Sequence, residues 1–303
     1  MPHITYLEAV VLGAVQGISE LFPVSSLGHA ILLPAVIGGA WARDLDVTAP
    51  HSPYLAFIVA LHVATALALI VYYRRDWLAL LRGFVDSIRT RRIRTLEARL
   101  VWLLILATIP VAIVGLAFDH LLRAALGSPT PTAAFLVVNG FLLIAVHLVT
   151  RTGRGRHGPE ETPPHGGGVE SVVSDQHIAR LTPLRAVAVG AAQIAALFPG
   201  ISRSGSTIIA GRLAGLPNRS AARFAFLLAT PAILAAGVLE IPTLLTPAER
   251  PVLGPTGVGA IVAFVAALLA VSFLDRYFAR RSVWPFGVYC IVAGIGALVL
   301  LHG

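Results

Sequence analysis

Six long apolar runs follow one another along the chain, at residues 54–73, 99–118, 132–149, 221–245, 256–274 and 283–301. A helix needs ~20 predominantly apolar residues to cross the hydrocarbon core of a bilayer, and each run is close to that length. The hydrophobic pattern therefore predicts six membrane-spanning helices in an all-α, polytopic integral membrane protein.

Two shorter apolar stretches are broken by clusters of Pro, Gly and Ser. One covers 4–18 and 28–39, and the other covers 184–198 and 206–216. Each piece is too short to cross, so we predict two re-entrant helical hairpins, at 4–39 and 184–216, which enter the membrane and return. Irregular backbone at membrane depth is tolerated only beside protein or a water-filled cavity, so the breaks indicate a functional site.

The two predicted hairpins share a sequence pattern. Residues 12–16 (LGAVQ) followed by 21–23 (LFP) recur as 189–193 (VGAAQ) followed by 197–199 (LFP), with a slip of one residue before the Ser and Gly that follow. Chance similarity between two apolar Gly/Ala segments is the alternative. We predict an inverted-topology repeat with halves 1–150 and 184–303, each a hairpin plus three spans. Residues 151–183, rich in Gly, Pro and charge, are predicted to form a flexible cytoplasmic linker.

Composition excludes an ordinary soluble enzyme. Apolar residues make up 56% of the 303 residues, and charged residues make up 13%, about half of the ~25% that is typical of soluble domains. The net charge of +8 comes from arginine, since the chain has no lysine. On a membrane protein this excess indicates cytoplasmic loops and anionic headgroups, so no nucleic-acid partner is expected. The N-terminus lacks the basic start and the cleavage site of a signal peptide, so none is expected.

The arginine positions predict an orientation. Alternating the spans places three arginine clusters on one side of the membrane, which the positive-inside bias assigns to the cytoplasm. The other side then holds both termini and the connections 119–131 and 246–255, so the first hairpin enters from outside and the second from inside. The clusters are Arg74, Arg75, Arg82, Arg89, Arg91, Arg92, Arg94 and Arg99; Arg151, Arg154, Arg156 and Arg180; and Arg276, Arg280 and Arg281.

The first hairpin carries side chains suited to proton transfer. Gln16 and Glu20 are four residues apart and therefore share one face of a helix. A break follows, and Ser25, Ser26 and His29 open the next helix. A carboxylate, a histidine and hydroxyls can activate a nucleophile and protonate a leaving group. Each serine is equally suited to satisfying backbone groups or to close helix packing.

The second hairpin offers an anion site. Its break, residues 199–207 (PGISRSGST), places a Gly/Ser-rich turn and Arg203 at the start of a short helix. A helix N-terminus carries partial positive charge, and a guanidinium can hold two phosphate oxygens at once. Glu20 and Arg203 in apolar surroundings indicate phosphoryl transfer or phosphate-ester hydrolysis, with a purely structural ion pair as the alternative.

Other histidines are weaker candidates. His62 lies alone on a predicted span and fits packing as well as it fits support of a site. His157, His165 and His177 fall in the predicted linker at spacings that match no metal-ligand pattern, so we expect them to be solvated.

Two segments resemble the signatures of a known family. Residues 16–29 (QGISELFPVSSLGH) and 199–207 (PGISRSGST) are similar to the first and second signatures of the undecaprenyl-diphosphate phosphatase family associated with bacitracin resistance. The resemblance covers nearly the whole chain apart from 151–183. It implies a multi-pass enzyme of the bacterial inner membrane that hydrolyses undecaprenyl diphosphate, a C55 polyprenyl diphosphate, to the monophosphate and inorganic phosphate. That monophosphate is the lipid carrier recycled for cell-wall synthesis.

The resemblance also implies site residues. The catalytic set is Glu20, Ser26, His29 and Arg203, and the substrate-binding set is Gln16, Ser25, Ser202, Ser204, Gly205 and Thr207. Ser26 or His29 would supply the attacking group or activate water, and the sequence leaves that choice open. Glu20 would orient His29 or hold Mg²⁺ or Ca²⁺, and no organic cofactor is expected. The chain departs from the family at Gln16, which takes the first acidic place, and at Leu27, where a hydroxyl residue is usual.

Two other functions stay open. An inverted-repeat transporter of a lipid phosphate or a small anion would use the same broken helices as an anion cradle. A catalytically weakened relative that only binds its lipid is suggested by Gln16 and Leu27. The expected partners are the polyprenyl diphosphate lipid and the membrane, a homo-oligomer is left open, and the site is expected to face outside.

Overall fold

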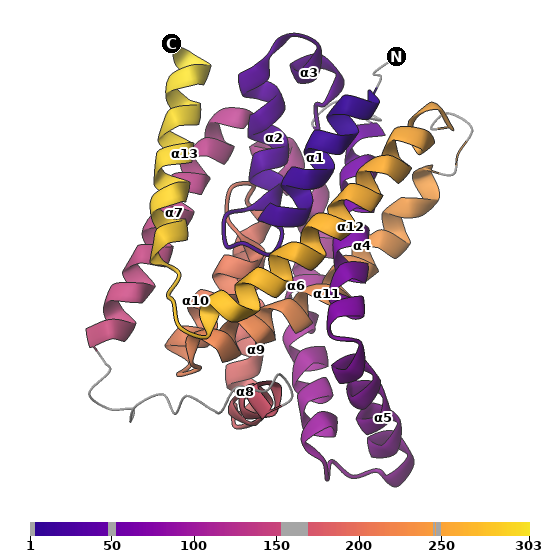
Figure 1. The fold of residues 1–303 in the computed structure, drawn as a ribbon, viewed down its shortest axis with the longest axis vertical. Coiled ribbons are helices and arrows are strands. Elements are labelled where there is room, and N and C mark those ends of the chain that lie inside the picture. The colour runs from indigo at the N-terminus through magenta and orange to yellow at the C-terminus, as the bar shows by residue number, and fades with distance from the viewer. Residues whose placement is uncertain (1–3, 48–52, 153–168, 245, 247–249) are drawn as a thin grey trace.

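The chain folds into helices, and the described residues contain no strand (Figure 1). The structure is a computed structural model that describes residues 4–47, 53–152, 169–244, 246 and 250–303. In chain order the elements are α1 (Tyr6–Ser19), α2 (Ser26–Ile37), α3 (Gly39–Asp44), α4 (Pro53–Tyr72), α5 (Arg74–Thr90), α6 (Leu96–Leu126), α7 (Pro129–Thr152), α8 (Val169–Ala179), α9 (Pro183–Ala191), the 3₁₀ helix η2 (Ala192–Leu197), α10 (Arg203–Leu213), α11 (Asn218–Leu244), α12 (Arg250–Phe278) and α13 (Trp284–His302). The predicted all-α class is confirmed.

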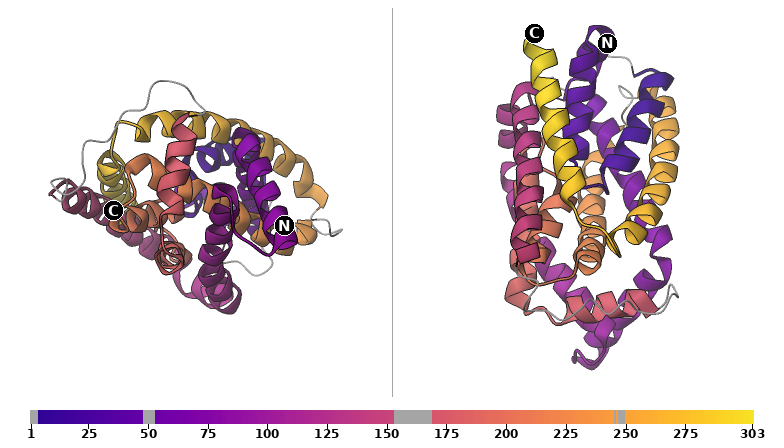
Figure 2. Two further views of the ribbon diagram at one scale, coloured as in Figure 1. Left: turned by 90° about the horizontal axis from the view of Figure 1, so that it is seen from below. Right: turned by 60° about the vertical axis from the view of Figure 1, so that its left-hand side comes forward.

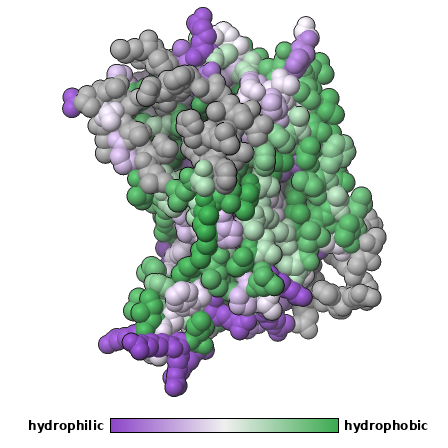
Figure 3. All heavy atoms as spheres, turned by 180° about the vertical axis from the view of Figure 1, so that it is seen from behind, coloured by the Kyte–Doolittle hydropathy of each residue, from purple (hydrophilic) through white to green (hydrophobic). Residues whose placement is uncertain are grey.

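Within the described ranges, six helices are long and apolar enough to cross a membrane. Their spanning segments are Tyr54–Tyr72, Leu96–Ala117, Pro129–Thr150, Asn218–Val238, Arg250–Phe278 and Trp284–His302. They coincide with the six apolar runs, so the predicted spans are confirmed. Large apolar side chains such as Ile113, Leu116 and Val292 are exposed on them. Figure 3 accordingly shows an apolar band between more polar ends, the surface expected of a chain surrounded by lipid.

Both predicted hairpins are formed by short helices. α1 and α2 make the first, and α9, η2 and α10 make the second. α1 begins with a capping box in which Thr5 and Glu8 each accept a hydrogen bond from the other's backbone N–H. Its 14 residues extend ~21 Å, short of the ~30 Å hydrocarbon core. The helical pairing is confirmed, whereas the entry of the two hairpins into the membrane stays a prediction.

The two hairpins make matching contacts with the opposite halves of the chain. α1 packs along α12, and α9 packs along α6, which are the second spans of their respective halves. A Cβ on Gly13 would overlap the backbone of Gly259, and a Cβ on Gly190 would overlap the backbone of Ala107. Gly13 and Gly190 hold equivalent places in the sequence pattern, and only glycine allows so close an approach. This exchange of partners supports the predicted inverted repeat.

The arrangement of the helix ends agrees with the predicted topology. α1 begins and α13 ends at one end of the molecule, whereas α5, α8 and the connection between α12 and α13 lie at the other end (Figure 1; Figure 2). Most of the clustered arginines that the structure describes lie on or directly beside these three elements, whereas Arg154 and Arg156 lie outside the described residues. These described arginines therefore lie toward one end of the molecule, while the assignment of that end to the cytoplasm stays a prediction.

Part of the predicted linker is helical. Within 151–183, residues Val169–Ala179 form α8, so this part is not the flexible segment that the Gly- and Pro-rich composition predicts; residues 153–168 lie outside the described residues. α8 is held by Arg223 on α11, whose side chain is 5% exposed. The Arg223 Nε binds Asp175 on α8 at 2.7 Å, and Nη2 binds Asp76 at 2.9 Å. A buried guanidinium shared by two carboxylates is a strong, oriented contact, and it fixes α8 against α11.

One histidine of the predicted linker lies in the part of the chain that the structure describes. His177 lies on α8, and its Nδ1 is 3.1 Å from Ser220 Oγ on α11. His157 and His165 lie outside the described residues. Across the part of the chain that the structure describes, no group of three His, Cys, Asp or Glu side chains could hold a metal ion.

Candidate active site

Glu20 is the centre of a hydrogen-bonded cluster that joins the two hairpins. Its side chain, at the end of α1, is 4% exposed. Its Oε2 accepts hydrogen bonds from Gln16 Nε2 at 2.9 Å and from Ser26 Oγ at 2.5 Å. Its Oε1 pairs with Arg203 Nη2. Four residues predicted for the site are thus brought together, three from the first hairpin and one from the second.

The break in the first hairpin directs Ser26 toward this carboxylate. α2 begins at Ser26 because Ser25 caps it and accepts the Gly28 N–H at 3.2 Å. The cap holds Ser25 at φ +68°, which is uncommon for a residue other than glycine. Backbone strain of this kind costs ~1–3 kcal/mol and is concentrated at functional sites. The turn therefore stores strain where it brings a hydroxyl to a carboxylate.

The break in the second hairpin is shaped by Gly200 and Ser202. Gly200 has φ +102°, and a Cβ there would overlap the backbone of Thr132 on α7, so glycine alone fits without movement. Ser202 then caps α10 by accepting the Gly205 N–H at 3.1 Å. Arg203 is the first residue of α10. The turn and the cap together direct its guanidinium toward the first hairpin.

Two helix N-termini face the cluster and make it attractive to an anion. The N–H groups in the first turn of a helix have no intrahelical acceptor, and the caps satisfy only those of Gly28 and Gly205 in α2 and α10. Helix N-termini also carry partial positive charge. One Nη of Arg203 donates to Glu20, and the other N–H groups of its guanidinium have no partner within the described ranges. The site can therefore bind a phosphate through a guanidinium and backbone N–H groups together.

The hydroxyls predicted to bind phosphate have structural partners. Ser25 and Ser202 serve as helix caps. Thr207 Oγ1 donates to a carbonyl four residues earlier at 2.9 Å, and Ser204 Oγ donates to the Phe22 carbonyl at 3.2 Å. These bonds shape the two turns. Ser204 and Thr207 donate their hydroxyl protons to carbonyls, whereas Ser25 and Ser202 act as acceptors at the caps. Their direct contact with phosphate stays a prediction, as does that of Gly205.

His62 lies at the cluster, although the sequence made it only a weak candidate. Its Nε2 is 3.1 Å from Glu20 Oε2 and 3.4 Å from Ser26 Oγ, and its Nδ1 donates to the Ile58 carbonyl at 2.8 Å. A carbonyl can only accept, so Nδ1 carries a proton and Nε2 is the nitrogen that faces the cluster. The sequence indicated His62 only as an ionisable residue within a predicted span. It did not show the contact with Ser26, because the two residues are 36 positions apart.

His29 has other partners. Its Nδ1 donates to the Ser25 carbonyl at 2.7 Å, and its Nε2 is 2.7 Å from Tyr289 Oη on α13, with the two rings stacked. Both ring nitrogens are therefore engaged, and the described residues show no bond between His29 and Glu20. The predicted orientation of His29 by Glu20 is thus not observed, because the serine carbonyl and the tyrosine hold the ring. A catalytic role for His29 stays a prediction.

The donor set around Glu20 fits a divalent cation poorly. Mg²⁺ and Ca²⁺ are held by several oxygen ligands, carboxylates above all. Here Gln16 supplies an N–H donor in place of a second carboxylate, and both oxygens of Glu20 already accept from nitrogen or hydroxyl donors. Glu20 therefore does not fit as the ligand of a resident cation, and a need for Mg²⁺ or Ca²⁺ stays a prediction that chelation tests.

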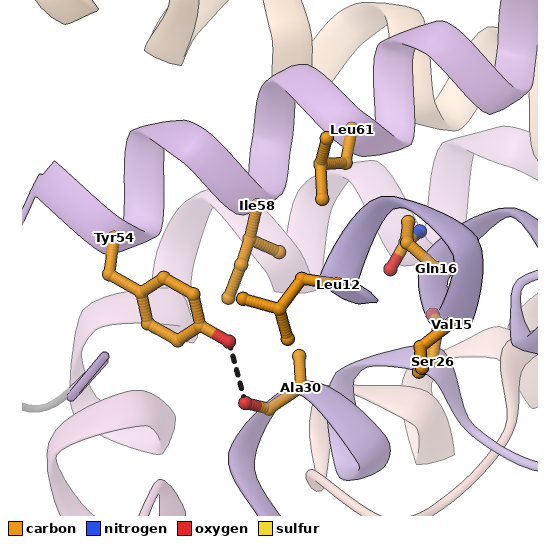
Figure 4. A pocket seen from close by; sticks show the side chains of 8 residues that line it. All are labelled: Leu12, Val15, Gln16, Ser26, Ala30, Tyr54, Ile58 and Leu61. Carbon is orange, nitrogen blue, oxygen red and sulfur yellow. Dashed lines mark hydrogen bonds between the residues drawn. The ribbon is translucent and has the colours of Figure 1, made fainter. Parts of the chain in front are cut away.

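A narrow apolar cleft adjoins the cluster between α1, α2 and α4 (Figure 4). Gln16 and Ser26 lie toward one end of it, and Tyr54 lies at the other. Apolar side chains such as Leu12 and Ile58 form the walls between them. The cleft has no room for a water molecule, so it shows only that apolar side chains begin directly at the polar cluster.

Comparison with known proteins matches nearly the whole chain to one family. A family described as bacitracin resistance protein BacA matches residues 9–296. An undecaprenyl-diphosphatase of Mycolicibacterium paratuberculosis is 54% identical over 303 residues, which cover 99% of this chain and 98% of the relative. Undecaprenyl-diphosphatase 1 of Frankia casuarinae is 46% identical, with 97% of each chain covered. An undecaprenyl-diphosphatase of Gluconobacter oxydans is 42% identical, with 98% of this chain and 100% of the relative covered.

Proposed function

Because the chain belongs to the bacitracin resistance protein BacA family, we propose that it is a membrane hydrolase that converts undecaprenyl diphosphate to the monophosphate and inorganic phosphate. The monophosphate is the lipid carrier that cell-wall synthesis reuses. The proposal rests above all on the contact between the Ser26 hydroxyl and the Glu20 carboxylate, which Arg203 of the other hairpin holds in place. A nucleophile, a proton acceptor and an anion-binding cation in one buried cluster are the parts that a phosphatase needs.

In the proposed reaction, the terminal phosphate binds where the Arg203 guanidinium and the N-termini of α2 and α10 converge. These groups offset the charge that spreads over the phosphoryl oxygens in the transition state. With Ser26 as nucleophile, its oxygen attacks the terminal phosphorus, its proton passes to Glu20, and the anhydride bond breaks to release the lipid monophosphate. Water then cleaves the phosphoserine and restores the hydroxyl.

Two other nucleophiles give the same products. Water can attack directly with Glu20 and His62 as the base, and His29 can attack after a rearrangement that frees one ring nitrogen from Ser25 or Tyr289. Trapping the phosphoenzyme distinguishes the three routes. An acid-stable adduct assigns Ser26, an acid-labile adduct assigns His29, and the absence of an adduct assigns water.

Replacing His62 with glutamine is expected to lower kcat about 10²-fold with a smaller change in KM, because positioned acid–base groups contribute ~10²–10⁴-fold. The loss is expected to change the pH profile of kcat, measured as phosphate release from purified protein. His147→Gln is the matched control, since His147 lies on α7 and its Nδ1 is 2.7 Å from Ser282 Oγ, a contact outside the cluster. Equal losses in the two variants, or none in His62→Gln, would contradict a role for His62 in proton transfer.

A transporter is the competing function, since opposed hairpins can cradle an anion during transport. Transport has no need of a hydroxyl that donates to a buried carboxylate, and this contact favours hydrolysis. We expect purified protein in proteoliposomes to release inorganic phosphate from undecaprenyl diphosphate. Movement of intact diphosphate across the bilayer without phosphate release would instead identify a transporter, and binding without either would identify a weakened relative.

We further propose that the protein lies in the bacterial inner membrane with its site facing outside. The arginine-bearing end, with α5 and α8, is the end that the positive-inside bias assigns to the cytoplasm. A cysteine placed at Gly303 tests the orientation, since the native Cys290 is buried. An impermeant maleimide added outside intact cells should label Gly303→Cys, and labelling only after lysis would reverse the orientation.

A further inference from the structure

Asn139 on α7 bonds to the turns of both hairpins. Its side chain is fully buried. Its Nδ2 donates to the Pro23 carbonyl at 3.0 Å, in the turn between α1 and α2. Its Oδ1 accepts the Ser202 N–H at 3.1 Å, in the turn before α10. Over the described ranges, it is the one side chain that binds the main chain of both turns.

The orientation of this carboxamide follows from its partners. The Pro23 carbonyl can only accept and the Ser202 N–H can only donate, so Nδ2 and Oδ1 cannot exchange places. Nδ2 also lies 3.4 Å from Cys290 Sγ on α13, which holds the amide from a third side. Asparagine is therefore required here as a donor and an acceptor at once, and neither Asp nor Leu offers both at neutral pH.

The two bonded positions are adjacent to the reacting groups. Pro23 lies three residues after Glu20, and Ser202 directly precedes Arg203. The turns also touch through Ser204 Oγ and the Phe22 carbonyl at 3.2 Å. A change in the separation of the turns would change how the carboxylate and the guanidinium meet.

We propose that Asn139 is a positioning residue for phosphate release: it fixes the separation of the two hairpin turns, and through them the separation of Glu20 and Arg203. Its effect on catalysis rests on the proposed hydrolase function, whereas the tie between the turns does not. Asn139 touches neither reacting group in the described structure, so its influence is exerted through the backbone. A misplacement of about 1 Å between catalytic groups costs ~10²-fold in rate.

The kinetic test compares Asn139→Leu and Asn139→Asp with the wild type. Asn139→Leu removes both bonds and is expected to lower kcat about 10²-fold at every pH, with a smaller change in KM. Asn139→Asp keeps the acceptor for Ser202. Its carboxyl can donate to the Pro23 carbonyl only while it is protonated, so its kcat relative to the wild type should fall as the pH rises.

A purely structural role predicts a different result. It would reduce the amount of folded protein in both variants while leaving kcat per folded molecule and its pH profile unchanged. Thr132→Val is the matched control, because Thr132 is a fully buried polar residue of the same helix whose hydroxyl donates to the Ser128 carbonyl on its own chain segment at 2.9 Å. We expect near wild-type kcat from Thr132→Val. A wild-type kcat in Asn139→Leu would overturn the proposal.

Hydrogen exchange supplies a readout that does not depend on activity. In Asn139→Leu, the peptides that contain Pro23 and Ser202 should exchange faster than in the wild type, while those of the α1–α12 contact should not change. Unchanged exchange at both turns would refute the tie. Absence of phosphate release from the wild type would instead refute the proposed function, and the exchange result would still decide whether Asn139 joins the turns.

Discussion

Replacing Glu20 with glutamine is expected to lower kcat for phosphate release about 10³-fold, within the ~10²–10⁴-fold range of general acid–base catalysis. Glutamine keeps the shape of the side chain, but it cannot take a proton from Ser26, which donates to Glu20 at 2.5 Å. It also removes the charge that holds Arg203. The guanidinium is then free to donate more hydrogen bonds to the substrate. We therefore expect KM to stay constant or to fall while kcat decreases.

Glu8→Gln is the matched control for this prediction. Glu8 is the other buried carboxylate of α1, 3% exposed, and its Oε2 accepts from the Thr5 N–H at 2.7 Å in the capping box. The same chemical change there costs only cap stability, ~0.5–2 kcal/mol. Steady-state kinetics should show a near wild-type kcat for Glu8→Gln. Similar losses in both variants would mean that the effect of Glu20→Gln is on folding.

Replacing Arg203 with alanine is expected to lower kcat/KM about 10²–10³-fold, the cost of removing one transition-state donor from a buried site. The loss should fall on both parameters, because the guanidinium binds the phosphate and offsets its developing charge. Arg203→Lys keeps the charge but loses the fork of donors, so we expect an intermediate rate. Initial rates of phosphate release from undecaprenyl diphosphate in detergent measure both variants.

Arg212→Ala controls for loss of an arginine from the same helix. Arg212 lies in the last turn of α10, and its Nη1 donates to the Leu216 carbonyl at 2.8 Å. Its removal should leave phosphate release near the wild-type rate. An equal loss in Arg212→Ala would show that disruption of α10, and not loss of the phosphate ligand, explains Arg203→Ala.

The departure at Gln16 has a structural explanation. The sequence suggests a weakened enzyme, since Gln16 replaces a carboxylate. In the structure Gln16 Nε2 donates to Glu20 Oε2 at 2.9 Å and so favours the ionised carboxylate. A glutamate at position 16 would place two carboxylates within hydrogen-bond distance. Their charges would repel, so one of the two would have to be protonated. Gln16 therefore helps to keep Glu20 ionised, the form to which the Ser26 hydroxyl donates, without a second carboxylate at position 16.

The features that the sequence predicted well depend on local constraints. The bilayer requires apolar runs of ~20 residues, so the six spans follow directly from the hydrophobic pattern. The Gly- and Ser-rich turns end and cap short helices by local bonds, as Ser25 and Ser202 do. Glu20 and Arg203 were found because charge is costly in apolar surroundings.

The features that the sequence missed depend on contacts between distant segments. Asn139 is 116 positions from Pro23 and 63 from Ser202. The residues next to an asparagine in a span do not indicate which distant groups its side chain binds. α8 forms in the part of the predicted linker that contains no Gly or Pro, and Arg223, 48 positions away, binds its Asp175. The sequence likewise does not show that the hydroxyls predicted as phosphate ligands also bond within the two turns, and their contact with phosphate stays a prediction.

A double-mutant comparison of Glu20 and Arg203 tests the central claim most directly. The measurement is the rate of phosphate release from undecaprenyl diphosphate by the wild type, Glu20→Gln, Arg203→Ala and the variant with both changes, at equal amounts of folded protein. Since the two side chains act as one unit, the double variant should be no slower than the slower single variant. Losses that multiply, or wild-type release by Arg203→Ala, would contradict a catalytic centre built from the two hairpins.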